Sequence, residues 1–407
     1  MKKNAIYIAS HGITFLAGFV LTIMLPKILS VSEYAQLSIE IALLNILLPI
    51  AAFGLTPYII RTFPKQDDIT YNLRDTVYFL FIIGNFIAFG GVVLISLFRN
   101  DTLNFVSLSV LILAIVFTSL GTVASGLYRA KKDAVKYFMI VVSSKTLLLV
   151  CVLGSFYTFN DWTVEYYFVS LLISAALAIL ICQGDVLPSK YLNKKTTLAD
   201  CRKSLYFCFP IVLSNVLVMA VPFLERSIID VMLLEEELAQ YVFNFEVSAK
   251  FSAIVLLSIK ILIWPNIVDK LEEKEKVKFK KYGYKIILIL TGVVSLICFF
   301  GETTYEYVVG VFINKFYINF EVFSFAIIFA ALNVLLYYIN LSVLLSGKTY
   351  IMTFGCVLIL SSHYFGLIYL IPIYGIAGAS ISAILSTTFG IIFSIVLNNK
   401  YFFTRKR

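Results

Sequence analysis

Two lysines lie deep within apolar stretches of the sequence, where an ammonium group could bind an anionic ligand. Lys145 lies in residues 134–156 and Lys250 in residues 239–263. Counting 1.5 Å per helical residue places each of them about 16 Å from an end of its stretch. A charge at that depth of a bilayer costs at least about 2.5 kcal/mol unless it faces water, a counter-ion or an anionic substrate. We therefore predict that Lys145 and Lys250 bind substrate, with Arg226 as a third candidate.

Local ion pairs are the alternative role for the same cations. Glu246 precedes Lys250 by one helical turn, in the order that favours an intrahelical pair. Lys145 has no carboxylate within four residues along the chain, which makes it the stronger candidate for binding substrate. Arg226 follows Glu225 near one end of its stretch, where a structural pair, or a side chain that reaches toward the headgroups, is equally expected.

Titratable side chains within apolar stretches also indicate where a coupling ion could bind. Ion coupling or charge pairing is predicted for Glu40, Glu246, Glu225 and His363. Their sequence contexts do not separate protons from sodium ions. The six cysteines form no CxxC pair, so no metal site is expected, and no cofactor apart from a coupling proton or sodium ion.

The elements that must position these side chains are apolar stretches, each long enough to cross a bilayer as a helix of about 20 residues. The composition agrees, because 60% of the residues are hydrophobic and 14% are charged, far from the averages of soluble domains. The predicted fold class is an all-α polytopic membrane protein with about twelve transmembrane helices. These are predicted at 5–25, 38–60, 76–98, 105–127, 134–156, 163–183, 205–229, 239–263, 283–301, 320–345, 350–371 and 375–397.

Most of the 33 lysines and arginines fall in alternate loops between the predicted helices. Short loops that are rich in Lys and Arg stay in the cytoplasm, so both termini are predicted to be cytoplasmic. The net charge of +9 then reflects loops that face anionic lipid headgroups, and no nucleic-acid partner is expected.

Six predicted helices precede a basic segment and six follow it. We predict an N-terminal six-helix bundle at residues 1–183, a cytoplasmic basic linker at 184–204 and a C-terminal six-helix bundle at 205–407. Halves of this kind are parallel repeats, and transporters built from them bind substrate near the bilayer midplane. No Walker, HExxH or GxSxG motif occurs and the outward loops are short, so an enzyme is not expected.

Four regions of the chain carry motifs of a known family. They are Pro26 to Ala35, Phe53-Gly54-Leu55 with Arg61, Glu225-Arg226-Ser227-Ile228-Ile229 with Ala239-Gln240-Tyr241, and Pro372 to Ala379. Together they resemble the Wzx-type O-antigen or capsule repeat-unit flippases, a polysaccharide transporter family within the multidrug/oligosaccharidyl-lipid/polysaccharide exporter superfamily. The chain differs from the family pattern in having Glu225 for the usual Asp and Ala35 for the usual Gly.

The resemblance implies two six-helix bundles of the MATE type and a transporter of the bacterial inner membrane. Its substrate would be an undecaprenyl-pyrophosphate-linked oligosaccharide, moved from the cytoplasmic to the periplasmic leaflet by alternating access. Membrane lipids, a polysaccharide polymerase and a chain-length regulator are the partners implied. Lys145 and Lys250 would then contact the pyrophosphate or acidic sugars, since such charges cannot cross hydrocarbon unaided. A multidrug or other lipid exporter of the same superfamily and a membrane-embedded polysaccharide polymerase are the alternatives.

Overall fold

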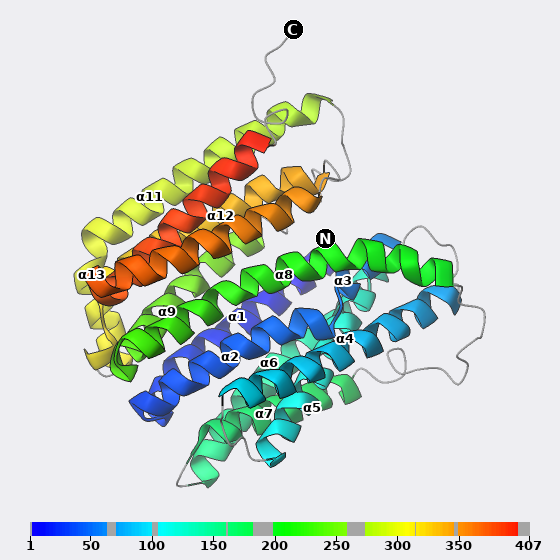
Figure 1. The fold of residues 1–407 in the computed structure, drawn as a ribbon, viewed down its shortest axis with the longest axis horizontal. Coiled ribbons are helices and arrows are strands. Elements are labelled where there is room, and N and C mark those ends of the chain that lie inside the picture. Colours follow the sequence, from blue (N-terminus) through cyan, green and yellow to red (C-terminus); the bar gives the residue numbers. More distant parts are fainter. Residues whose placement is uncertain are drawn as a thin grey trace. The chain divides into compact units, whose positions relative to one another are not determined.

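The computed structural model describes residues 2–62, 71–99, 105–159, 162–181, 198–258, 273–313, 315–345 and 349–397 (Figure 1). Within these ranges the regular elements are all helices, as the sequence predicts. The first seven are α1 (Lys2–Ile28), α2 (Val31–Ala51), α3 (Leu55–Thr62), α4 (Tyr71–Arg99), α5 (Phe105–Ala130), α6 (Ala134–Thr158) and α7 (Val164–Ile181). They are followed by α8 (Leu198–Met232), α9 (Glu235–Ser258), α11 (Glu273–Phe312), the 3-10 turn η3 (Lys315–Tyr317), α12 (Phe320–Leu345) and α13 (Thr349–Leu397).

Ten segments of the described residues are long and apolar enough to cross a membrane. One of them joins α2 to α3, and another is α13, which covers the last two predicted helices. Helix α9, the predicted eighth span, is not among the ten, and the side chains of residues 251, 252 and 254–258 near its end lie outside the described residues. The end of that predicted span, at 263, and residues 184–197 of the predicted linker lie outside the described residues.

Helix α2 begins at Val31, earlier than the predicted start at 38, because a capping box fixes its first turn. The Ser30 hydroxyl and the Ser30 N–H donate to Glu33 Oε2 at 2.6 and 3.0 Å, and the Glu33 N–H donates to Ser30 Oγ at 3.3 Å. This exchange satisfies N–H groups that the start of a helix leaves without partners. The polar turn is therefore helical although it is not apolar.

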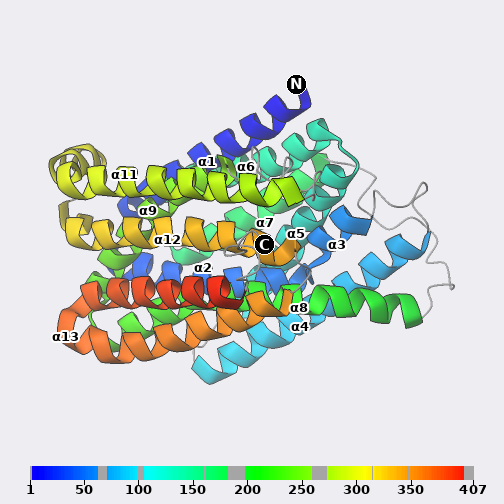
Figure 2. The same ribbon diagram turned by 90° about the horizontal axis from the view of Figure 1, so that it is seen from above.

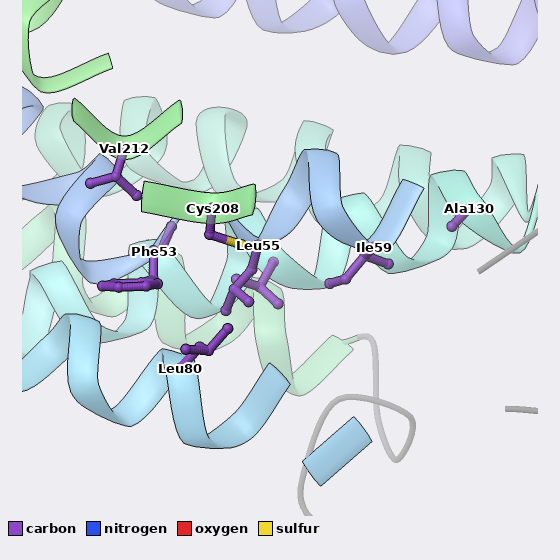
Figure 3. Packing of buried hydrophobic residues seen from close by; sticks show 9 residues of the cluster. Phe53, Leu55, Ile59, Leu80, Ala130, Cys208 and Val212 are labelled. Atoms are coloured by element: carbon purple, nitrogen blue, oxygen red, sulfur yellow. The ribbon is translucent and has the colours of Figure 1, made fainter. Parts of the chain in front are cut away.

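A break separates α2 from α3 within the predicted second span. Phe53 and Gly54 have φ values of 46° and 61°, which end α2 because the left-handed region cannot continue an α-helix. Figure 3 shows Phe53, Leu55 and Cys208 in one apolar cluster around this break. A Cβ on Gly54 would lie 3.1 Å from the Cys208 carbonyl oxygen, so α8 packs closely against the backbone of the break.

Helix α13 folds back on itself as two antiparallel limbs. Gly375 has a φ of 58°, a conformation that glycine adopts without steric cost, and Pro372 precedes it. A Cβ on Gly378 would overlap the Leu370 carbonyl, so the limbs approach closely beside the bend. The orange and red limbs lie side by side in Figure 2, next to α12.

The chain forms two compact units. Unit 1 contains residues 1–21 and 40–219, and unit 2 contains residues 22–39 and 220–407. Helices α1, α2 and α8 therefore contribute residues to both units, whereas the predicted bundles follow chain order. The predicted bundle and linker boundaries stay a prediction. In unit 1, α7 packs against α5 and α6, and in unit 2, α12 packs against α9, α11 and α13.

Candidate functional site

Three charged side chains of unit 2 form one connected group, which we call the Arg226 cluster: Arg226, Glu246 and Lys250. Arg226 Nη2 donates to Glu246 Oε1 at 2.8 Å, and Lys250 Nζ lies 3.6 Å from Glu246 Oε2. Arg226 Nη1 also donates to the Ser38 carbonyl at 2.6 Å. Arg226 comes from α8, Glu246 and Lys250 from α9, and Ser38 from α2. The intrahelical pair that was the alternative role for Lys250 is thus present, but its carboxylate is shared.

Burial differs between the two cations of the cluster. The Arg226 side chain is 9% exposed, whereas those of Lys250 and Glu246 are 25% and 32% exposed. Two firm hydrogen bonds hold the guanidinium, while the ammonium has a longer contact and a freer side chain. Lys250 can therefore turn toward a ligand without breaking the contacts that position Arg226.

The charges of the Arg226 cluster do not cancel. Two side chains that carry positive charge share the single carboxylate of Glu246, so the cluster keeps a surplus of one positive charge. A charge inside a membrane protein is costly unless it faces water or a counter-ion. The arrangement is therefore suited to binding a negatively charged group.

A second group in unit 2, the Glu225 pair, consists of Glu225 and His363. His363 Nε2 lies 3.0 Å from Glu225 Oε1, and the two side chains are 0% and 5% exposed. Neighbouring residues of a helix point about 100° apart, so Glu225 turns toward α13 while Arg226 turns toward α9 and α2. Ser382, on the second limb of α13, contacts the other ring nitrogen of the histidine, with Oγ 2.9 Å from Nδ1.

The remaining predicted site residues lie in unit 1. Lys145 is exposed near the middle of α6, and Glu40 is half-buried on α2. The structure thus brings together Arg226, Glu246 and Lys250, places Glu225 beside His363, and leaves Lys145 and Glu40 in the other unit. The substrate-binding and ion-coupling roles of all seven stay predictions.

Three residues that contact these two groups were not predicted from the sequence. Ser38 takes part through its backbone carbonyl, which no side-chain pattern reveals. Tyr241, whose buried hydroxyl interacts with Glu225, was named only within a segment that resembles the flippase family, and Ser382 reads as an ordinary residue of an apolar stretch. Only a pairing of α8 with α9 and α13 could have indicated them.

Two polar residues of α9 form hydrogen bonds with the η3 turn. Gln240 Nε2 donates to the Phe316 carbonyl at 2.9 Å, and Asn244 Nδ2 donates to the Tyr317 carbonyl at 3.0 Å. The Tyr305 hydroxyl donates to Asn244 Oδ1. These bonds fasten the η3 turn to α9, so they explain Gln240 and Asn244 without a ligand.

Comparison with protein families matches residues 1–268 to the family described as polysaccharide biosynthesis protein. Comparison with curated proteins gives no match.

Solved structures with the same fold include an inward closed form of the lipid II flippase MurJ. It is 12% identical, with a TM-score of 0.66, over 97% of this chain and 87% of that one. The MATE multidrug transporter DinF-BH is 11% identical, with a TM-score of 0.63, over 99% and 96% of the two chains. An inward-facing multidrug resistance MATE family transporter of the MOP superfamily is 14% identical, with a TM-score of 0.61, over 97% and 96%. At these identities the likeness shows the fold, and it confirms the predicted class of all-α polytopic membrane protein.

Proposed function

The chain belongs to the polysaccharide biosynthesis protein family, and on this premise we propose that it is a flippase for a lipid-linked oligosaccharide. The substrate is an undecaprenyl-pyrophosphate-linked repeat unit of an O-antigen or capsule. The protein carries it from the cytoplasmic to the periplasmic leaflet of the bacterial inner membrane by alternating access. The fold shared with a lipid II flippase and with MATE transporters supports a transport role over an enzymatic one.

The observation that carries the proposal is the surplus positive charge of the Arg226 cluster. A pyrophosphate group cannot enter hydrocarbon without a strong desolvation cost, so a protein that moves it must supply compensating cations. Lys250 is the member that contacts the pyrophosphate, because its ammonium is partly exposed and lies as far as 3.6 Å from Glu246 Oε2. Arg226 keeps Glu246 in place and adds to the positive field.

Lys145 is the second cation that we assign to the substrate. It lies near the middle of α6 and is exposed, as a residue that lines an aqueous path would be. Its contribution is an additional contact to the pyrophosphate or to an acidic sugar. A polysaccharide polymerase and a chain-length regulator are proposed as the partners that take up the flipped unit.

The net charge of the cluster also bears on the two alternatives. An exporter of cationic drugs needs a site dominated by carboxylates, whereas the Arg226 cluster carries more positive than negative charge. A polymerase would join repeat units to one another instead of carrying them across the membrane. Its products would be longer lipid-linked chains, not flipped units. The two alternatives therefore give different products in one assay.

The test is complementation of a bacterium that lacks its own repeat-unit flippase. Surface polymer and lipid-linked units of the inner leaflet are measured with the wild type and with Lys250→Gln, Lys250→Arg and Lys145→Gln. Lys27→Gln, which removes an exposed lysine at the end of α1, is the matched control. We expect surface polymer with the wild type, Lys27→Gln and Lys250→Arg, and accumulated inner-leaflet units with Lys250→Gln and Lys145→Gln.

Two outcomes would reject the proposal. One is failure of the inserted wild-type protein to restore polymer in several repeat-unit backgrounds while it increases resistance to cationic drugs. The other is full activity of Lys250→Gln and Lys145→Gln together, because transport would then not depend on the cations to which we assign the pyrophosphate.

A further inference from the structure

We infer that Glu225, His363 and Ser382 form a binding site for one proton, and that the site is built for a proton and not for sodium. Glu225 lies on α8, while His363 and Ser382 lie on the two limbs of α13. The proton site itself stands on this geometry alone, whereas its use in coupling rests on the proposed transport function.

A shared proton stabilises the Glu225 pair at its observed distance. His363 Nε2 and Glu225 Oε1 are 3.0 Å apart and are almost completely buried. If neither group were protonated, an electron-rich ring nitrogen and a carboxylate oxygen would lie 3.0 Å apart in a site of low polarity, which is repulsive. One proton removes the repulsion, and it can reside either on Nε2, giving an imidazolium and a carboxylate, or on the carboxyl group.

Ser382 determines which nitrogen of the histidine exchanges that proton. Its Oγ lies 2.9 Å from His363 Nδ1 and 3.0 Å from the His363 carbonyl oxygen. A carbonyl can only accept, so when the single hydroxyl proton of Ser382 goes to it, Nδ1 carries a hydrogen that it donates to Oγ. In this arrangement Nε2, which lies next to Glu225, is the position that gains or loses the proton.

Three polar atoms near His363 Nε2 and Glu225 have no hydrogen-bond partner among the described residues. Glu225 Oε1, His363 Nε2 and the Tyr241 hydroxyl oxygen are buried and have no hydrogen bond of good geometry to any described residue. Buried polar atoms without partners are rare in native proteins and call for an explanation. A proton that enters from the medium and binds between Glu225 and His363 accounts for two of the three, and the Tyr241 hydroxyl can donate to the carboxylate when it forms.

The choice of ligand atoms favours a proton over a sodium ion. Hard cations are held by several oxygen ligands, whereas the partner of the Glu225 carboxylate is an imidazole nitrogen. Imidazole is the side chain whose protonation changes most readily near neutral pH. Within the described residues, no group of three or more His, Cys, Asp or Glu side chains could hold a metal ion.

Other charged and titratable groups lie around the pair on each element that packs there. Arg226 is the next residue of α8, and it pairs with Glu246 on α9, which in turn contacts Lys250. Tyr241 on α9 interacts with Glu225, and Tyr34 on α2 interacts with Arg226 and Glu246. With its proton the Glu225 pair is neutral and the Arg226 cluster keeps its surplus positive charge. Release of the proton to the medium leaves a negative charge beside Arg226 and cancels that surplus.

The consequence is a link between proton binding and anion binding in unit 2. An anion bound at the Arg226 cluster is attracted more strongly when the pair is protonated, and by linkage the bound anion promotes uptake of the proton. Protonation of Glu225 and His363 thereby regulates how tightly Lys250 and Arg226 hold the pyrophosphate group.

Nitrogen-15 NMR of the purified, histidine-labelled full-length protein tests the site directly. The chain has two histidines, so His11→Gln assigns the signals of His363. His11 Nε2 lies 3.3 Å from the Tyr137 hydroxyl on α6, in unit 1, so this variant leaves the Glu225 pair unchanged. Ring nitrogen shifts are recorded as a function of pH, and infrared difference spectra record the carboxyl bands.

We expect His363 Nδ1 to stay protonated throughout, and the Nε2 and carboxyl signals to change together in one step. The carboxyl part of that step should be lost in Glu225→Gln, and the preference for the Nδ1–H form should be lost in Ser382→Ala. Exchange of sodium chloride for choline chloride at fixed pH should leave the His363 signals unchanged. A His363 with unprotonated Nδ1, two separate titration steps, or a shift specific to sodium in the wild type would each overturn the inference.

These measurements need no transport and no substrate, so they separate failure of the proton site from failure of the proposed function. The link is tested by the affinity for inorganic pyrophosphate, measured by calorimetry over the same pH range. Wild-type affinity should rise as the pH falls through the shared step, and His363→Gln should abolish this dependence. A wild-type affinity that does not change across the step would show that the proton site and the anion site are independent.

Discussion

Replacement of Glu246 by Gln is the sharpest test of the ion pairs in unit 2. It removes the only carboxylate of the Arg226 cluster and leaves two cations facing an amide. Breaking a buried pair by removing one partner typically costs about 3–5 kcal/mol, since the other charge is left uncompensated. Glu246 is 32% exposed, so solvent screens part of this loss. We expect a loss of unfolding free energy of about 2–3 kcal/mol in Glu246→Gln, most of it from the contact with Arg226.

The contribution of each contact to the free energy of unfolding depends on how deeply the contact is buried. Lys250 is 25% exposed and 3.6 Å from the carboxylate, so Lys250→Met should cost less than about 1 kcal/mol. Arg226→Met removes the donor to Glu246 Oε1 and to the Ser38 carbonyl, and should cost about 3–4 kcal/mol. The double variant Arg226→Met with Glu246→Leu removes both charges together. Apart from the cost of losing the hydrogen bond to the Ser38 carbonyl, it should be destabilised by about 1 kcal/mol or less.

The assay is reversible unfolding in bilayers or micelles by steric trapping, with the double-mutant cycle evaluated from the wild type, Arg226→Met, Glu246→Leu and the double variant. Glu236→Gln, which alters an exposed carboxylate at the start of α9, is the matched control. The reasoning would be refuted if Glu246→Gln were no more destabilising than Glu236→Gln. A double variant whose loss equalled the sum of the single losses would likewise show that Arg226 and Glu246 do not interact.

Two further predictions concern the backbone elements that position the site. Gly378→Ala should destabilise the bend of α13 by about 1–3 kcal/mol, because the new Cβ would overlap the Leu370 carbonyl. The control is Gly12→Ala, where a Cβ meets open space. A lower melting temperature for Gly378→Ala than for the control would support the prediction, and equal melting temperatures would contradict it. Ser30→Ala should cost about 1 kcal/mol by removing the capping box of α2; faster proteolysis near Val31, restored by Ser30→Asp, would support this, whereas unchanged cleavage would argue against it.

Local features of the sequence were sufficient to predict the class of protein. Apolar stretches of about 20 residues can only be buried in lipid as helices, so the all-α polytopic fold follows from hydropathy alone. The intrahelical contact between Glu246 and Lys250 also follows from local spacing, because residues four apart share a helix face. The Ser30 and Glu33 capping box lies within four residues and was readable in the same way, although apolar pattern alone placed the helix start at 38.

Contacts between distant segments were decided only by the tertiary structure. No sequence pattern indicates that Arg226 takes Glu246 instead of Glu225, its neighbour in the chain, as its partner. Nor does any pattern indicate that Glu225 meets His363, because this depends on how α8 packs against α13 and on the bend at Gly375 that brings Ser382 beside the ring. Hydropathy fixes which residues are buried but not which face of a helix meets which neighbour. The sequence therefore determined which charges lie within apolar stretches, and the packing of the helices determined how they are paired.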